Sequence, residues 1–294
     1  MKRILLNISY IAKLATKWTS AIFAFIGVLS TFASLSDLFP SQLSAWCQFL
    51  ISACILFGVW IVAFVVCACY VLVKRRIKVL SLNADHHVYV QYGDLFSENE
   101  VLEPNRRRNI VIPVNRCFDT IVDDDLVSSR SLHGLAMNKL YNEGIYTQEQ
   151  LNDKIKENLN QQQVPFEHIY RVDKRKGNLE RYKLGSVAEV PASQNCTYFF
   201  LGLTVFDSNL KASVTNVSYV AALMRLLEFC NTRSQGCPVV IPLIGGGMAR
   251  TGRSEREILE YMIQLLKLYK ELINCDIHIV VRDSGKGSIG ITDL

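Results

Sequence analysis

The stretch CPVVIPLIGGGMARTGRSEREILEYM, residues 237–262, decides the fold class. Its apolar run 239–244 predicts a buried strand, which Gly245, Gly246 and Gly247 close. Ser254 and Glu257 then have the spacing of a capping box, which predicts that a helix begins there. A strand that passes through a glycine turn into a helix is the repeating unit of α/β domains. We therefore expect a sheet that is covered by helices.

The rest of the chain after residue 84 repeats this alternation. Further strands are predicted at 86–92, 109–114, 197–206 and 276–281, and helices at 131–141, 147–159 and 213–231. Lys176-Gly177-Asn178 separates two alternating runs and predicts a hairpin. The expected fold class is α/β, with residues 84–294 forming one three-layer α/β/α domain around a mixed sheet.

The first quarter of the chain has the composition of a membrane anchor. Residues 18–35 and 38–73 contain no charged side chain, and KRRIK follows at 74–78. Because about 20 apolar residues cross a bilayer, we expect transmembrane helices at about 18–37 and 46–73, within a hairpin domain 1–83 that has a basic flank. The basic flanks predict a multi-pass protein of the inner (cell) membrane with both termini cytoplasmic. A cleaved signal peptide and buried core helices are the alternatives.

Composition and charge exclude several classes of protein. Half of the residues are hydrophobic, which excludes intrinsic disorder. Residues 1–82 hold eight Lys or Arg against one Asp, so the positive charge flanks the apolar segments and a nucleic-acid partner is not expected. The nine cysteines include no CxxC pair, which favours buried thiols over disulfides or a zinc site.

Three strand ends carry the candidate ligand-binding residues, because ligands of open α/β sheets bind beyond the carboxyl ends of strands. Asp94 follows the first strand, Asn115 follows the second, and the glycine triplet 245–247 follows a late strand. Successive glycines can turn their N–H groups toward one anion, although a plain turn needs the same glycines. Asp94 and Asn115 alone also fit turn residues, 123–125 fits a solvated loop better than a metal site, and His133 fits a structural role.

Taken together, these strand ends resemble the macro domain, a module that binds ADP-ribose. The motifs YVQYGDLF (89–96), IVIPVNRCF (110–118) and VVIPLIGGGMARTG (239–252) occur in the family's order. The resemblance implies that Asp94 accepts from adenine, that Asn115 and its loop meet the distal ribose, and that the glycine loop wraps the diphosphate. The implied ligand-binding set is Asp94, Leu95, Asn115, Phe118, Ser131, His133, Gly245, Gly246, Gly247, Met248, Ala249 and Arg250.

One departure from the family pattern bears on catalysis. Hydrolytic macro domains usually carry a second Asn three residues after the first, and Phe118 stands at that position. We therefore expect a binder with no catalytic residues, no metal and no cofactor, since the groups that would position water are missing. A membrane-tethered ADP-ribosyl hydrolase and a membrane scaffold that binds no nucleotide are the alternatives.

Two apolar helices before a divergent macro domain resemble the membrane-anchored effectors of type II Thoeris anti-phage defence. That resemblance implies a signal derived from ADP-ribose, histidine-ADP-ribose in this type, which a TIR-domain partner makes from NAD. It also implies a homo-oligomer that disrupts the membrane in abortive infection. We further expect the signal to order the loop 118–134 over the pocket.

Overall fold

The computed structural model describes residues 2–29, 44–82, 85–104, 106–245, 253–283, 285, 288–292 and 294. The chain forms two compact units, one of residues 1–75 with 287–294 and one of residues 76–286. The division falls after Arg75 and not after residue 83, because the segment that follows Arg75 is a strand of the sheet. The last residues group with the N-terminal helices, which the sequence did not indicate.

The N-terminal unit contains α1 (Lys2–Leu6), α2 (Ile8–Leu29) and α3 (Ala45–Val73). Helix α2 begins ten residues before the predicted start, and the predicted end of this span lies outside the described residues. The segments Ile8–Val28 and Trp46–Val73 are long and apolar enough to cross a bilayer.

A small apolar cluster joins α2 and α3 where Ile11 and Ala15 pack against Cys67 and Val71. Most other apolar side chains of α3 are exposed, which fits a helix with apolar surroundings.

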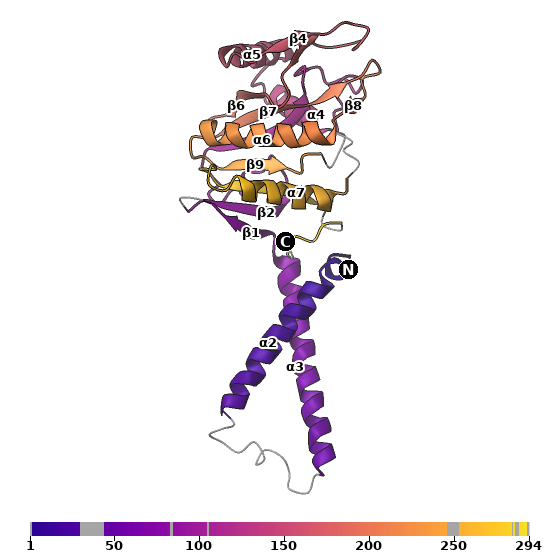
Figure 1. Cartoon of the computed structure of the whole chain (residues 1–294), viewed down its shortest axis with the longest axis vertical. Helices are drawn as coiled ribbons and strands as arrows, with labels where there is room; N and C mark the ends of the chain where they lie inside the picture. Colours follow the sequence, from indigo (N-terminus) through magenta and orange to yellow (C-terminus); the bar gives the residue numbers. More distant parts are fainter. Residues whose placement is uncertain are drawn as a thin grey trace. The chain divides into compact units, whose positions relative to one another are not determined.

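A mixed sheet forms the centre of the larger unit, residues 76–286 (Figure 1). Its strands are β1 (Arg76–Ser81), β2 (His87–Gly93), β3 (Arg108–Asn115), β6 (Val187–Ser193), β7 (Cys196–Phe206), β8 (Ala212–Ser213), β9 (Val239–Pro242) and β10 (Ile277–Arg282). The order is β1-β2-β10-β9-β3-β7-β6, and β8 pairs with β7. The five strands from β2 to β7 in this order are parallel, while β1, β6 and β8 are antiparallel to their neighbours.

Helices cover the sheet as the α/β prediction requires. They are α4 (Leu132–Asn142), α5 (Gln148–Gln161), α6 (Asn216–Arg233) and α7 (Glu255–Leu268), and a short 3₁₀ turn, η2 (Glu98–Glu100), precedes β3. Both predicted capping boxes are present, at Thr147 of α5 and Ser254 of α7. Apolar side chains of α4 and α5 share one core with β3 and β7. The three-layer prediction is therefore confirmed.

The predicted hairpin is also present, as β4 (Phe166–His168) paired with β5 (Glu180–Tyr182). Strand β1 was not predicted, and neither was the two-residue strand β8. Residues 76–78 belong to the basic run after α3 that is predicted as the basic flank of the membrane hairpin, yet Arg76–Ser81 pairs with β2 as an edge strand. Because β2, β10, β9, β3 and β7 are parallel, their carboxyl ends lie along one edge of the sheet and bring the loops that follow them together.

Candidate functional site

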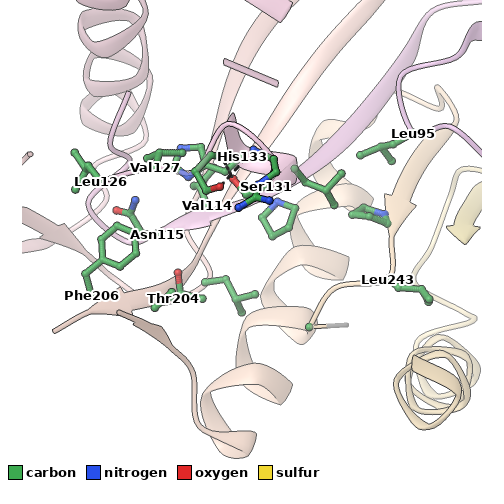
Figure 2. Close-up of a pocket in the computed structure, with 18 of the residues that line it drawn as sticks. Leu95, Val114, Asn115, Leu126, Val127, Ser131, His133, Thr204, Phe206 and Leu243 are labelled. Carbon is green, nitrogen blue, oxygen red and sulfur yellow. Dashed lines mark hydrogen bonds between the residues drawn. The ribbon is translucent and has the colours of Figure 1, made fainter. Parts of the chain in front are cut away.

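A cavity of about 600 Å³ lies at this edge of the sheet. Residues at or just after the carboxyl ends of five parallel strands line it: Leu95 follows β2, Asn115 ends β3, Thr204 lies in β7, Leu243 follows β9 and Arg282 ends β10. Figure 2 shows Leu95 and Leu243 toward one side of the cavity, and Asn115, Thr204 and Phe206 toward the other. This volume is in the range of small-molecule sites.

The cavity gathers five of the residues that the motifs singled out: Leu95, Asn115, Ser131, His133 and Gly245. Gly245 has a φ of 96°, a conformation that favours glycine, as we expected for a strand closed by a glycine turn. Gly246, Gly247, Met248, Ala249 and Arg250 lie outside the described residues.

Two predicted residues, Asp94 and Phe118, are absent from the described lining of the cavity. Asp94 is exposed beside Leu95, and its Oδ1 accepts a hydrogen bond of 3.1 Å from the N–H of Phe96. Phe118 is 1% exposed and packs edge-to-face on Tyr182 in the core. Its φ is 50°, and its side chain belongs to the hydrophobic core and not to the described lining of the cavity.

Asn115 is held in a fixed orientation at the end of β3. Its side chain is buried, and Oδ1 accepts a hydrogen bond of 2.9 Å from the N–H of Cys117. Its Nδ2 has no hydrogen-bond partner within the described residues, although the amide lies close enough to Asp119 to favour the charged form of that carboxyl. A buried donor without a partner is costly, and a bound hydroxyl or carbonyl oxygen would satisfy it.

A buried ion pair holds the loop that follows Asn115. The Nζ of Lys174 lies 2.7 Å from Asp119 Oδ2, and both side chains are 1% exposed. The N–H of Asn178 donates to Asp119 Oδ1 at 2.6 Å. Burial raises the pKa of the Asp119 carboxyl, and Lys174 opposes that shift. The segment between β4 and β5 therefore fixes the loop that follows Asn115. No sequence pattern predicted this contact.

His133 occupies the first turn of α4 and lines the cavity. Its Nε2 lies 2.8 Å from the carbonyl oxygen of Asp119, which can only accept, so Nε2 carries a proton and donates. Burial lowers the pKa of His133 to about 4, so the ring is neutral near pH 7. It is a structural histidine at the wall of the cavity, and it offers no positive charge to a phosphate.

The N-terminus of α4 faces the same cavity. Ser131 is its N-cap: Oγ accepts from the N–H of Gly134 at 3.0 Å and donates to the carbonyl of Ser128 at 2.7 Å. A Cβ at Gly134 would lie 2.2 Å from that Ser128 oxygen, so only glycine allows this close approach. The start of a helix favours negative charge, and Ser131, Leu132 and His133 place it along the cavity.

The loop between Asp119 and Ser131 is tied to the hairpin by its acidic side chains. Asp123 pairs with Lys176, and Asp125 pairs with Arg175. Asp123 Oδ1 also accepts from the N–H groups of residues 125 and 126. Contacts within the chain therefore connect this loop to the hairpin. No cluster of metal-ligating side chains occurs among the described residues.

A second buried network supports the turn at Asp94. Glu100 is fully buried; its Oε1 accepts from the N–H of Asp94 at 3.2 Å, and its other oxygen accepts from Nε2 of Gln91. Arg76, the first residue of β1, donates to the carbonyls of Asn99 and Glu100 at 3.0 and 3.1 Å. The strand that follows the apolar helix α3 is thus fastened to η2, which supports the N–H of Asp94.

Comparison with known proteins bears on the family of residues 88–282. The family model described as "Thoeris protein ThsA, Macro domain" matches residues 88–282. The Thoeris protein ThsA of Bacillus amyloliquefaciens (strain Y2) is 28% identical over 262 residues, which cover 86% of this chain and 79% of that protein.

Two solved macrodomains are also similar. A mutant macrodomain of Oceanobacillus iheyensis is 13% identical, with a TM-score of 0.42, over 72% of this chain and 88% of that chain. The macrodomain of DarG from Mycobacterium tuberculosis is 13% identical, with a TM-score of 0.36, over 64% and 96% of the two chains.

Proposed function

The chain belongs to the family of the ThsA macro domain of Thoeris defence, and from that premise we propose that residues 76–286 bind an ADP-ribose-derived signal. The observation that carries the proposal is the cavity itself. It combines a volume of about 600 Å³ with the start of α4 and a buried Nδ2 of Asn115 that has no hydrogen-bond partner among the described residues. An elongated nucleotide with a diphosphate and a ribose would use each of these features.

The chemistry of the lining supports one direction for the ligand. Asp94 follows β2 beside the lining residue Leu95, and its exposed carboxylate can accept from the amino group of adenine. Gly245 and the start of α4 offer N–H groups to the diphosphate. The amide of Asn115 then meets a hydroxyl of the distal ribose. The glycine loop that follows Gly245 would contribute Gly246, Gly247, Met248, Ala249 and Arg250 to the same diphosphate.

The lining beyond Asn115 supports an amino-acid group at the end of the nucleotide. Asp124, Arg130 and Lys211 carry charges of both signs there, and Phe206 adds an aromatic face. A zwitterionic amino acid presents an ammonium and a carboxylate, which suit this mixture, and an imidazole can stack on a ring. We propose histidine-ADP-ribose as the signal on this ground.

Binding without hydrolysis is the activity that the side chains favour. Phe118 is buried in the core, so it holds no water against a distal ribose. Asp119 is engaged by Lys174 and Asn178, and His133 donates its Nε2 proton to a carbonyl. The Asp119 carboxylate and the His133 imidazole, which lie near Asn115, are thus engaged in contacts within the protein. General base catalysis needs a group that can take a proton from water.

The two apolar helices give the proposed signal a target. We propose that they form a hairpin in the inner membrane with both termini in the cytoplasm, and that a TIR-domain partner supplies the signal from NAD. The bound protein would then associate with further copies and disrupt the membrane, which stops phage growth by abortive infection. Ser20 and Ala24, and likewise Cys54 and Gly58, are small-residue pairs on exposed faces that suit close helix packing.

Calorimetric titration of the detergent-solubilised full chain with ADP-ribose and with histidine-ADP-ribose tests the proposal. We expect both to bind, the histidine conjugate more tightly. Asn115→Ala should weaken binding about 10- to 100-fold, since one buried hydrogen bond is lost. Asn160→Ala, at an exposed position of α5, is the control and should bind like the wild type.

Other outcomes would decide between the alternatives. A wild-type protein that binds neither nucleotide contradicts the proposal and favours a membrane scaffold. Release of ADP-ribose from an ADP-ribosylated protein, abolished in Asn115→Ala, would instead identify a hydrolase.

A further inference from the structure

Two charged side chains that line the cavity, Glu255 and Arg282, lie apart from the others. Glu255 is the first residue of α7, and Arg282 is the last residue of β10. Arg282 Nη2 lies 3.8 Å from Glu255 Oε1, so the two form an ion pair in the wall of the cavity. The other lining residues that carry a charge belong to the loops after β3 and β7, and they are Asp124, Asp125, Arg130 and Lys211.

The order of the strands indicates which part of a nucleotide would lie over this pair. Strand β10 lies between β2 and β9 and is parallel to both. Arg282 is in register with Gly93, and Asp94, to which we assign the adenine, comes next in the chain. Gly245, to which we assign the diphosphate, follows the end of β9 by three residues. Because the adenosine ribose joins adenine to diphosphate, it passes over the carboxyl end of β10.

The chemistry of the pair distinguishes two kinds of adenosine ribose. In nucleotide sites a carboxylate accepts from the ribose 2′-hydroxyl, whereas an arginine accommodates a 2′-phosphate. Both groups are present here, and the side chains of Glu255 and Arg282 are 30% and 61% exposed, so a ligand can reach either one. The carboxylate compensates the charge of the guanidinium and would itself repel a phosphate. The pair therefore suits a free hydroxyl better than a phosphate.

We propose that Glu255 is a specificity-determining residue, which together with Arg282 selects an adenosine ribose whose 2′-hydroxyl is free. The inference rests on the proposed function, because that function places an ADP-ribose derivative in the cavity. The Glu255 carboxylate accepts a hydrogen bond from the 2′-hydroxyl, and Arg282 holds the carboxylate beside it. The site thus takes nucleotides derived from NAD and rejects their counterparts from NADP, which carry a phosphate on this hydroxyl.

Calorimetric titration of the detergent-solubilised full chain with ADP-ribose and with ADP-ribose 2′-phosphate tests the inference. The wild type should bind ADP-ribose at least about tenfold more tightly, because the 2′-phosphate meets a like charge at Glu255. Glu255→Gln keeps an oxygen that can accept from a hydroxyl, removes the charge and leaves the guanidinium of Arg282 for the phosphate. It should bind ADP-ribose within about threefold of the wild type, and the 2′-phosphate at least about tenfold more tightly than the wild type does.

Two further variants assign the effect to this pair. Glu260→Gln is the matched control, because it removes the same charge from the same helix at an exposed position outside the described lining of the cavity. It should keep the wild-type ratio of the two affinities. The double variant Glu255→Gln/Arg282→Gln should lose the gain in affinity for the 2′-phosphate, because Arg282 supplies it.

The wild-type ratio needs no variant, so it decides the inference even where a substitution disturbs folding. A preference for ADP-ribose smaller than about tenfold refutes the inference. So does a ratio that Glu255→Gln and Glu260→Gln change equally, in variants whose scanning calorimetry traces match that of the wild type. A wild type that binds neither nucleotide overturns the proposed function and the inference with it, whereas equal binding of both overturns the inference alone.

Discussion

Gly177→Ala tests how the hairpin supports the cavity. Gly177 has a φ of 84°, and a Cβ there would lie 2.2 Å from Asp119 Oδ1 and 2.6 Å from Leu126 Cδ2. The left-handed backbone costs a residue with a Cβ about 1 kcal/mol. Displacing the Asp119 carboxylate also breaks the hydrogen bond from Asn178 and loosens the buried pair with Lys174, which costs about 2–4 kcal/mol more. We expect a total loss of about 3–5 kcal/mol in the free energy of unfolding.

Gly144→Ala is the matched control for this substitution. Gly144 has a φ of 67°, but a Cβ there meets nothing within 4 Å. It should therefore lose only the backbone cost of about 1 kcal/mol. At about 2–4 °C per kcal/mol for a domain of this size, the Tm should fall by about 10 °C in Gly177→Ala and by about 3 °C in Gly144→Ala.

Differential scanning calorimetry of the full chain measures both values. Tryptophan fluorescence does not serve, because Trp18, Trp46 and Trp60 all lie in the apolar helices. Titration with ADP-ribose should show weaker binding for Gly177→Ala alone, since the displaced loop directly follows Asn115 and contacts His133 through the carbonyl of Asp119. Equal losses of stability in the two variants would refute the conclusion that the turn at Gly177 holds Asp119 in place.

Two further predictions concern buried titratable groups. Burial lowers the pKa of His133 and of His278 to about 4, whereas a histidine in the unfolded chain has a pKa of about 6.5. Between about pH 6.5 and about pH 4, therefore, only the unfolded chain protonates these two rings. The free energy of unfolding should therefore fall as the pH drops from about 6.5 to about 4, by up to about 3 kcal/mol for each histidine. A free energy of unfolding in urea that is the same at pH 7 and pH 5 would contradict this prediction. Glu100→Gln should cost about 1–3 kcal/mol by thermal unfolding, because both carboxylate oxygens accept from N–H donors and an amide can satisfy only one of them. Glu103→Gln, at an exposed carboxylate, should leave the Tm unchanged, and an equal effect of the two substitutions would contradict the role given to Glu100.

Local sequence signals were sufficient for most elements of the fold. Strands β2, β3, β7 and β10 follow from apolar or alternating runs, and the starts of α5 and α7 follow from capping boxes. Strand β1 did not follow, because Arg76 and Lys78 place it in a basic run after an apolar helix, which has the same composition as a membrane flank. Only its pairing with β2 makes it a strand, and that contact is not local.

The site was predictable where a motif sits on a strand end and unpredictable where distant segments meet. Asn115 and Gly245 line the cavity because parallel strands place both at one edge. Phe118 stands within a motif, but its side chain packs in the core against residues distant in the sequence, such as Tyr182. Lys174 lies in the charged run DKRK, which has the composition of a solvated turn, yet it is 1% exposed and pairs with a carboxylate 55 residues earlier in the chain.

The contact between Lys174 and Asp119 determines which substitutions should weaken the binding of a ligand. The side chain of Asp119 is bound by the hairpin, and its carbonyl is bound by His133 in the first turn of α4. The same residue follows Asn115 by four positions, so one buried group connects the hairpin to both elements that offer donors to the cavity. A displacement of the carboxylate is transmitted to Asn115 and to the start of α4 together, because the interior is packed and cannot absorb it locally. Substitutions in the turn 174–178, which does not line the cavity, should therefore weaken the proposed binding of a nucleotide as well as the stability of the fold.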